Sequence, residues 1–285
     1  PRSTLFPYTT LFRSGQRAGG AAMIIIRPDH DELIDAIEQR DIVRVLAQID
    51  QGVDVNAQKG LAIFRASMMG ATDIVHALID AGANIHVVDD YPLRAAVGTR
   101  EIGLVKRLLS LGANPGADND QSLAFAVRIN NAPLVRVLLE GGANPNGQWG
   151  NFLQRAACDG SVEILEALLS AGADPTTNKA AALMEAVFSE EPGALICAER
   201  LHAAGAKVVN EKGSLRQWLV EYAHKDVLEP LDTLVRFGLD PHHPDIDDLI
   251  RDEGKLNVQA WQQRVIMEQA IVHEIAPSRI PRASL

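Results

Sequence analysis

The densest group of residues that could do chemistry is the run Asp-Pro-His-His-Pro-Asp-Ile-Asp-Asp at 240–248. The imidazoles of His242 and His243, together with several carboxylates, are the ligand types that divalent metals take from proteins. The alternative is a solvated turn that its two prolines make rigid. We favour the turn, and we therefore predict no metal ligands and no cofactor, while a metal-binding role of His242 and His243 is kept as an alternative.

Catalytic signatures are absent from the sequence. It has no Gly-x-Ser-x-Gly elbow, no phosphate loop, no His-Glu-x-x-His and no cysteine paired with a histidine at a fixed local spacing. Cys158 falls at a variable, exposed position of an expected helix with no base nearby in sequence, so we interpret it as a spectator. We predict no catalytic residues and a protein that is not an enzyme.

Charge and composition exclude several classes of partner. The formal net charge of −10 is unsuited to a general nucleic-acid or acidic-membrane surface, which needs a basic face. The two cysteines, Cys158 and Cys197, have neither disulfide nor metal-finger spacing, which favours a reducing compartment. No apolar run approaches the ~18 residues of a membrane span. We expect a cytoplasmic protein; secretion as an effector, or a location in a host cytosol, is the alternative.

Short helices that recur along the chain must position any binding residues. A glycine ends a helical pattern every 30 residues and is followed by a small residue or valine and then by Asn or Asp. Nineteen residues before each glycine stands Leu or Ile, and sixteen before it always stands alanine, a column that indicates close approach of two elements. These glycines are Gly52, Gly82, Gly112, Gly142 and Gly172, and the alanines are Ala36, Ala66, Ala96, Ala126 and Ala156.

This pattern, Leu-x-x-Ala in the first helix and Gly-Ala-Asn/Asp after the second, resembles the ankyrin repeat family over about residues 32–242. The compact 30-residue form is similar to repeats of bacterial and large-DNA-virus ankyrin proteins. The resemblance implies a mainly α fold, an α-solenoid of about seven helix-turn-helix units joined by short hairpin loops. The shortening falls in the hairpin region, and Arg40 and Arg100 replace the glycine between the two helices of their units at a cost of ~1–2 kcal/mol each.

We divide the chain into three parts. Residues 4–14 resemble the translation of a sequencing adapter, so 1–22 are left out of the fold as artefactual or disordered; a signal peptide is the less favoured alternative, because Pro7 to Thr10 interrupt its apolar stretch. The solenoid is expected over 23–245. A C-terminal helical cap and tail are expected over 246–285, with a helix that Asn257 caps and that runs to Val272.

The resemblance also implies where a partner binds, on the concave face formed by the loop tips and the outward side of the first helices. Arg, Trp, Tyr, Phe and Met concentrate binding energy at interfaces, and these types gather there across units two to five. Packing against the neighbouring repeat is the competing interpretation for Met68 and Phe125. The predicted partner-binding residues are Arg65, Met68, Met69, Tyr91, Phe125, Arg128, Trp149 and Arg155.

The function predicted from these observations is a non-enzymatic protein–protein interaction module. Its partner is an unidentified protein, and the acidic balance of the chain favours one with a basic surface. We expect a monomer that binds neither nucleic acid nor membrane. The alternative is that the chain is the recognition part of a larger effector or enzyme, truncated upstream of Met23.

Overall fold

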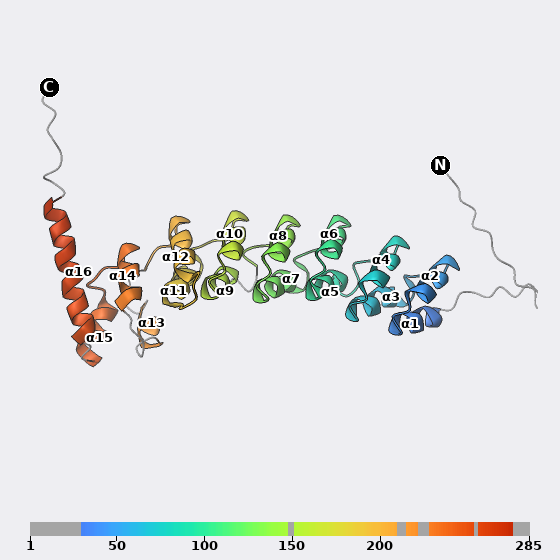
Figure 1. Cartoon of the computed structure of the whole chain (residues 1–285), viewed down its shortest axis with the longest axis horizontal. Helices are drawn as coiled ribbons and strands as arrows, with labels where there is room; N and C mark the ends of the chain where they lie inside the picture. The colour runs from blue at the N-terminus through green and yellow to red at the C-terminus, as the bar shows by residue number, and fades with distance from the viewer. Residues whose placement is uncertain (1–29, 148–150, 210–214, 222–227, 254–255, 276–285) are drawn as a thin grey trace, which may run out of the picture.

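The chain forms an elongated stack of paired helices with its two ends at opposite tips (Figure 1). The structure, a computed structural model, describes residues 30–147, 151–209, 215–221, 228–253 and 256–275. Within these ranges every regular element is a helix and no strand occurs. The helical solenoid predicted from the sequence is confirmed.

The helices lie in two layers, and each repeat contributes one helix to each layer (Figure 1). The lower layer in Figure 1 holds the first helix of repeats one to six, and successive members of this layer pack against each other. These first helices are α1 (His30–Glu38), α3 (Ala57–Met68), α5 (Tyr91–Thr99), α7 (Ala117–Arg128), α9 (Phe152–Cys158) and α11 (Thr177–Phe188). The second helices are α2 (Ile42–Asp50), α4 (Thr72–Asp80), α6 (Ile102–Ser110), α8 (Ala132–Glu140), α10 (Val162–Ser170) and α12 (Ala194–Ala203).

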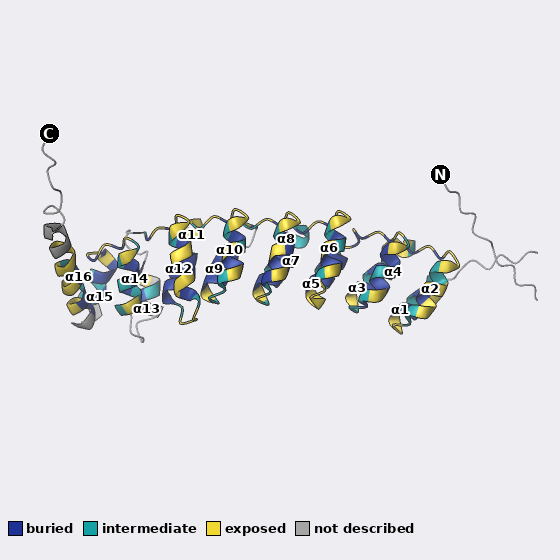
Figure 2. Cartoon of the chain, turned by 45° about the horizontal axis from the view of Figure 1, so that its top comes forward, coloured by how far each residue is buried: buried dark blue, intermediate teal, exposed yellow. Residues whose placement is uncertain are grey.

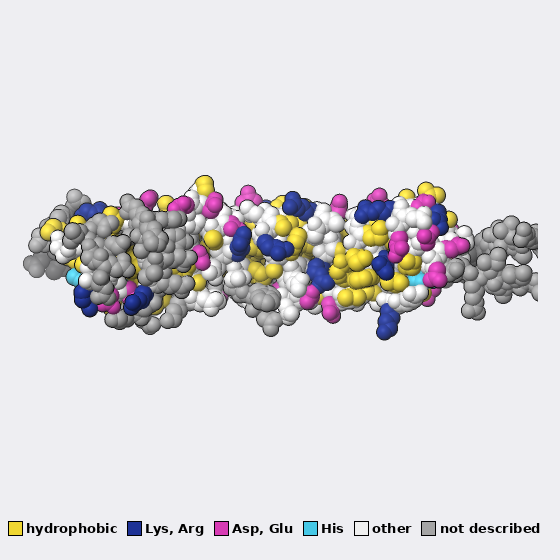
Figure 3. Space-filling model, turned by 90° about the horizontal axis from the view of Figure 1, so that it is seen from below, with side chains coloured by type: hydrophobic (Ala, Val, Ile, Leu, Met, Phe, Trp, Pro, Cys, Tyr) yellow, Lys and Arg dark blue, Asp and Glu magenta, His cyan; other side chains and the backbone are white. Residues whose placement is uncertain are grey.

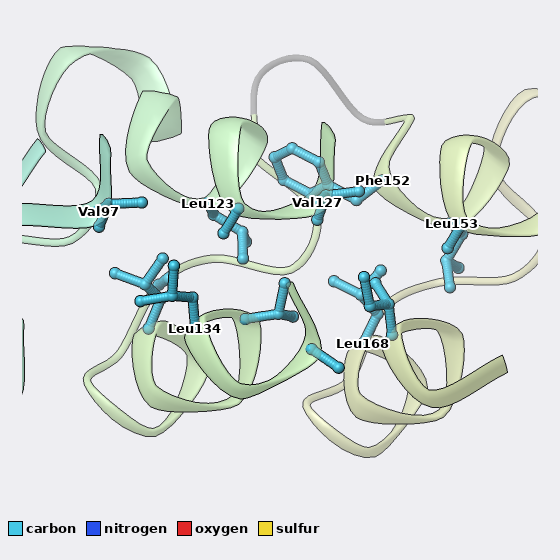
Figure 4. Close-up of a cluster of buried hydrophobic side chains, with 14 of the residues drawn as sticks. Val97, Leu123, Val127, Leu134, Phe152, Leu153 and Leu168 are labelled. Carbon is cyan, nitrogen blue, oxygen red and sulfur yellow. The ribbon is translucent and has the colours of Figure 1, made fainter. Parts of the chain in front are cut away.

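The core is one continuous apolar layer between the two rows of helices. Buried residues line the inside of every pair and exposed residues line the outside (Figure 2). Leu123, Val127 and Leu134 of repeat four and Leu153 and Leu168 of repeat five belong to the same buried apolar cluster (Figure 4). The alanine column is buried in all five repeats, as the close approach of the first helices requires.

The turn after each second helix has the geometry that its residues predict. Gly112 has a φ of +95°, and the N–H of Ala113 reaches back to the carbonyl of Leu108 at 3.0 Å, which closes a Schellman cap. The side chain of Asn114 then accepts the N–H of Gly116 at 2.9 Å. The prediction that Asn114 bonds its own backbone in this turn is confirmed.

The loops that join one repeat to the next differ from the expected hairpins. Residues 88–90 and 118–120 each form one left-handed turn, with every φ between +48° and +61°, and Gly60 ends a similar turn. Asp and Asn tolerate this conformation, whereas the β-branched Val88, at φ +48°, is strained. A 30-residue repeat has too few residues between its helices to pair two strands, and the left-handed turn reverses the chain in less length.

Side-chain amides also bind one loop to the next. Asn56 donates its amide to the carbonyl of Gly82 at 3.0 Å and accepts the N–H of Asn84 at 2.6 Å. Asn146 makes the same two bonds to the following turn. His86 stands at this position in repeat three, and there Asp90 instead accepts the N–H of Asn114 at 3.2 Å.

The C-terminal part continues with α13 (Arg216–Glu221), α14 (Leu228–Arg236), α15 (Pro244–Glu253) and α16 (Leu256–Ile275). The helix expected from Asn257 to Val272 lies within α16. Val258 and Trp261 on α16 are buried, and the indole N–H of Trp261 donates to Asp232 at 2.7 Å. Although α16 has 20 residues, none of the described helices is long and apolar enough to cross a membrane. The three-part division of the chain stays a prediction.

Repeat six carries its extra residues between α11 and α12, where the chain approaches repeat five closely. A Cβ added at Gly193 would lie 2.0 Å from the carbonyl oxygen of Gly160, which is backbone and cannot rotate away. We predict that Gly193→Ala lowers the free energy of unfolding by about 2 kcal/mol or more. Gly103→Ala on α6, where a Cβ meets nothing within 4 Å, should instead raise it by up to about 1 kcal/mol. Urea denaturation followed by circular dichroism measures both, and equal effects would contradict the close approach.

The joint between repeats two and three contains a small packing defect. The Oγ of Ser67 is buried without a hydrogen-bond partner among the described residues, and Ser67 borders a void of about 10 Å³. Repeats three and four carry Val97 and Val127 at the same position.

We predict that Ser67→Val raises the free energy of unfolding by about 1–2 kcal/mol, because it removes the unsatisfied hydroxyl and fills the void. Ser67→Ala removes the hydroxyl but leaves the void, so its gain should be smaller. Thermal and urea unfolding of the two variants provide the comparison. A valine variant less stable than the alanine variant would show that the joint has no room for the larger side chain.

Candidate functional site

The predicted partner-binding residues lie along the first helices, on the face opposite the second helices. Met68 is exposed, Arg65, Tyr91 and Phe125 are half-buried, and Arg128 is exposed. Trp149 lies outside the described residues. Seen from this side, hydrophobic side chains gather over α3 and α5, and Lys and Arg side chains are spaced along the face (Figure 3). We call this surface the first-helix face.

An aromatic cluster bridges repeats two and three on this face. The ring of Phe64 lies 4.9 Å from the ring of Tyr91, and the guanidinium of Arg94 lies 4.9 Å from the centroid of Tyr91. Arg94 also forms an ion pair with Asp118 in the loop of repeat four. We call Phe64, Tyr91 and Arg94 the aromatic bridge. Since its members contact one another across two repeats, their side chains are held in place before any partner arrives.

Two members of the aromatic bridge, Phe64 and Arg94, were not among the residues predicted from the sequence. They occupy the position directly after the buried Leu/Ile column, whereas the prediction took the position before the alanine column to face outward. The spacing of Tyr91 and Arg94, three residues apart on one helix, was the local signal for a cation–π contact. The contact of Phe64 with Tyr91 had no local signal, because it depends on how two repeats stack.

The other predicted residues form separate contacts. Arg128 stacks over Phe125 with 5.0 Å between its guanidinium carbon and the ring centroid. Arg155 forms an ion pair at 2.7 Å with Asp159, which lies four residues later in the chain. Met69 is half-buried against the core, and its carbonyl accepts a hydrogen bond from Arg40. Met68 lies one turn after Phe64 on α3 and so shares its side of that helix, whereas Arg155 lies on α9; participation of any of them in binding stays a prediction.

The charge of the first-helix face differs from that of the whole chain. Four successive repeats, two to five, each present one arginine there: Arg65, Arg94, Arg128 and Arg155. The chain as a whole carries −10. Three of these arginines are paired with carboxylates, Glu38, Asp118 and Asp159, and Arg128 has no ion-pair partner among the described residues.

In the turn at 240–248, the side chains of His243 and Asp245 bind backbone N–H groups. His243 is fully buried, and its Nδ1 accepts the N–H of Asp245 at 3.1 Å. The carboxylate of Asp245 accepts the N–H groups of Leu215 and Arg216, at 2.9 and 3.1 Å, at the start of α13. The expectation of a solvated turn was wrong for these two residues, because both are buried: His243 bonds the first turn of α15, and Asp245 bonds the start of α13. No group of three or more potential metal ligands comes together among the described residues.

Neither cysteine is activated. Burial, and then the carboxylates of Glu185 and Asp159, raise the pKa of the Cys158 thiol above its ordinary value. Burial raises the pKa of Cys197 to about 11. A nucleophilic cysteine needs a lowered pKa, so both environments work against thiolate chemistry at neutral pH.

The comparisons with known proteins bear on the same repeats. The family model for ankyrin repeats in three copies matches residues 93–179, which span the first helices α5, α7 and α9. Residues 93–179 thus match ankyrin repeats. A crystal structure of an ankyrin repeat domain from Acinetobacter baumannii AYE is 28% identical in sequence, with a TM-score of 0.44, and its match covers 50% of this chain and 81% of that one. No curated protein matches the chain.

The reactivity of the two thiols toward an alkylating reagent tests the structure in solution. We predict that iodoacetamide at pH 8 modifies exposed Cys158 and leaves buried Cys197 intact. Because the pKa of Cys158 is raised above 9.0, its thiolate fraction at pH 8 is smaller than that of free cysteine, and its labelling rate should rise as the pH passes 9. Peptide mass spectrometry measures both sites. Equal labelling of Cys197 in the folded protein would contradict its burial, and labelling of both in urea is the control.

Proposed function

We propose that this chain is a non-enzymatic protein-binding module whose binding surface is the first-helix face of repeats two to four. Ankyrin repeats are generally protein–protein interaction modules, and the family is typically non-enzymatic. Three candidate groups in the described part of the chain are unsuited to catalysis: both thiols have raised pKa values, and the buried His243 accepts a backbone N–H.

The aromatic bridge is the observation that carries this proposal. Tyr, Arg and Met are residue types that supply a large share of binding energy at interfaces. Here Tyr91 and Arg94 are fixed against Phe64, and Met68 is 48% exposed on the same helix as Phe64. Side chains that are already ordered lose little conformational entropy on binding, so a modest contact area suffices.

The partner-charge prediction needs revision for this surface. The net charge favours a basic partner for the chain taken as a whole. A partner that docks on the first-helix face, however, lies against the arginine side chains of repeats two to five. We therefore do not extend the basic-partner prediction to the proposed site.

The test is an affinity capture with the full chain, read by mass spectrometry, beside a variant that carries Met68→Ala, Tyr91→Ala and Arg128→Ala. We expect at least one protein to be retained by the parent and lost by this variant, because the three changes remove the exposed apolar and cationic groups of the face. Circular dichroism and thermal unfolding establish that the variant is folded.

A matched control carries Val43→Ala, Leu111→Ala and Arg136→Ala, which are exposed positions of repeats one, three and four on or directly after the second helices. It removes a comparable amount of apolar surface and one charge, and it should retain the captured protein. If both variants retain it, the first-helix face is not the binding surface. If only the control loses it, the second-helix side is.

A further inference from the structure

We propose that the first-helix face of repeats two to four binds an acidic segment of a partner protein, with an apolar residue of that segment seated on the aromatic bridge between two guanidinium groups. This inference deepens the proposed function and rests on it. The segment that the face binds is negatively charged, and its apolar residue lies on the aromatic bridge.

Two arginines on the face, Arg65 and Arg128, donate no side-chain hydrogen bond among the described residues, and of the two only Arg65 has an ion-pair partner there. Arg65 approaches Glu38 only at 3.8 Å, and its Nε is buried without a hydrogen-bond partner among the described residues. The side chain as a whole is 41% exposed, so its Nη groups, unlike the buried Nε, can reach an incoming carboxylate. In the described part of the chain, the side chain of Arg65 donates no hydrogen bond at all.

Arg128 stands two repeats further along in the same condition. It is exposed, and within the described residues its guanidinium forms neither an ion pair nor a hydrogen bond. Its guanidinium carbon lies over the ring of Phe125, 5.0 Å from the centroid. A stacked guanidinium keeps its in-plane N–H groups for a carboxylate, which it can bind through two parallel hydrogen bonds.

Tyr91 and Arg94 of the aromatic bridge lie on α5 in repeat three, between the repeats that carry these two cations. Its own arginine, Arg94, is already neutralised by Asp118, so the surface around Tyr91 is the apolar middle of the row. Hydrophobic side chains gather over α3 and α5 on this face (Figure 3), and the exposed Met68 lies on α3. The order along the face is therefore cation, apolar surface, cation, which matches a segment that carries a carboxylate on each side of an aromatic or aliphatic residue.

The surroundings favour a peptide over a nucleic acid. Carboxylates border the row on both sides, with Asp35 and Glu38 on α1 and Asp159 beside Arg155. A nucleic-acid backbone carries a charge at every nucleotide and would be repelled by these groups and by the net charge of −10. A peptide places its few charges only where the cations stand.

The test measures the fluorescence anisotropy of a labelled twelve-residue peptide built from three Glu-Glu-Leu-Phe units as the full chain is added. We expect binding that weakens with added salt. The double variant Arg65→Gln and Arg128→Gln should weaken it about tenfold or more, because two charge-assisted hydrogen-bond sites are lost. The matched control, Lys106→Gln and Arg136→Gln on the second helices, makes the same change in net charge and should bind like the parent.

Four results would overturn the inference. They are no binding of the acidic peptide, equal loss in the control variant, equal or tighter binding of a peptide of three Lys-Lys-Leu-Phe units, and tighter binding of a twelve-nucleotide oligouridylate. None of these decides the proposed function, which is tested by the protein captured with the parent and lost with the Met68, Tyr91 and Arg128 variant. A captured partner together with a failed acidic peptide would leave the binding face in place and remove its acidic selectivity.

Discussion

The structure depends on the burial of apolar side chains between neighbouring repeats. A single pair of helices leaves its Leu and Val stripe open on both flanks, and only the next pair covers it. The alanine column makes this possible, since Ala66, Ala96 and Ala126 are buried where successive first helices meet. A larger residue in that column would force the helices apart and open the apolar layer behind them. The spacing of everything on the first-helix face, the arginines included, follows from this contact.

Features set by local sequence could be predicted, because the same residues recur in each repeat. The left-handed glycine caps, the asparagine turn at Asn114, the buried alanine column and the helix through Trp261 are all decided within a few residues of chain. Agreement between repeats then multiplies a weak local signal. For this reason the fold could be predicted from this one sequence.

Features set by the stacking of two repeats were less accessible. The contact of Phe64 with Tyr91 joins residues 27 apart, and neither residue alone indicates it. The burial of His243 follows from the packing of α13 beside the turn, which sequence spacing does not reveal. The predicted binding residues that the structure describes lie on or beside the first helices, but two residues that contact or neighbour them there, Phe64 and Arg94, were not predicted. The net charge was a poor guide for the same reason, because it averages over faces that the fold separates.

The lateral pairs have a further consequence for folding. Identical repeats invite errors in which a repeat docks on the wrong neighbour, since the apolar columns match at every multiple of 30 residues. Side-chain contacts that differ from one joint to the next allow each repeat to pack well only on its proper neighbour. If repeat two skipped a neighbour and met repeat four, Phe64 would face Gln121 in place of Tyr91, and the bond from Gln154 to Glu185 has no equivalent at Ala124. The side chains that shape the surface thus also make each joint between repeats different from the others. They make the native order of repeats lower in energy than an order in which a repeat docks on the wrong neighbour.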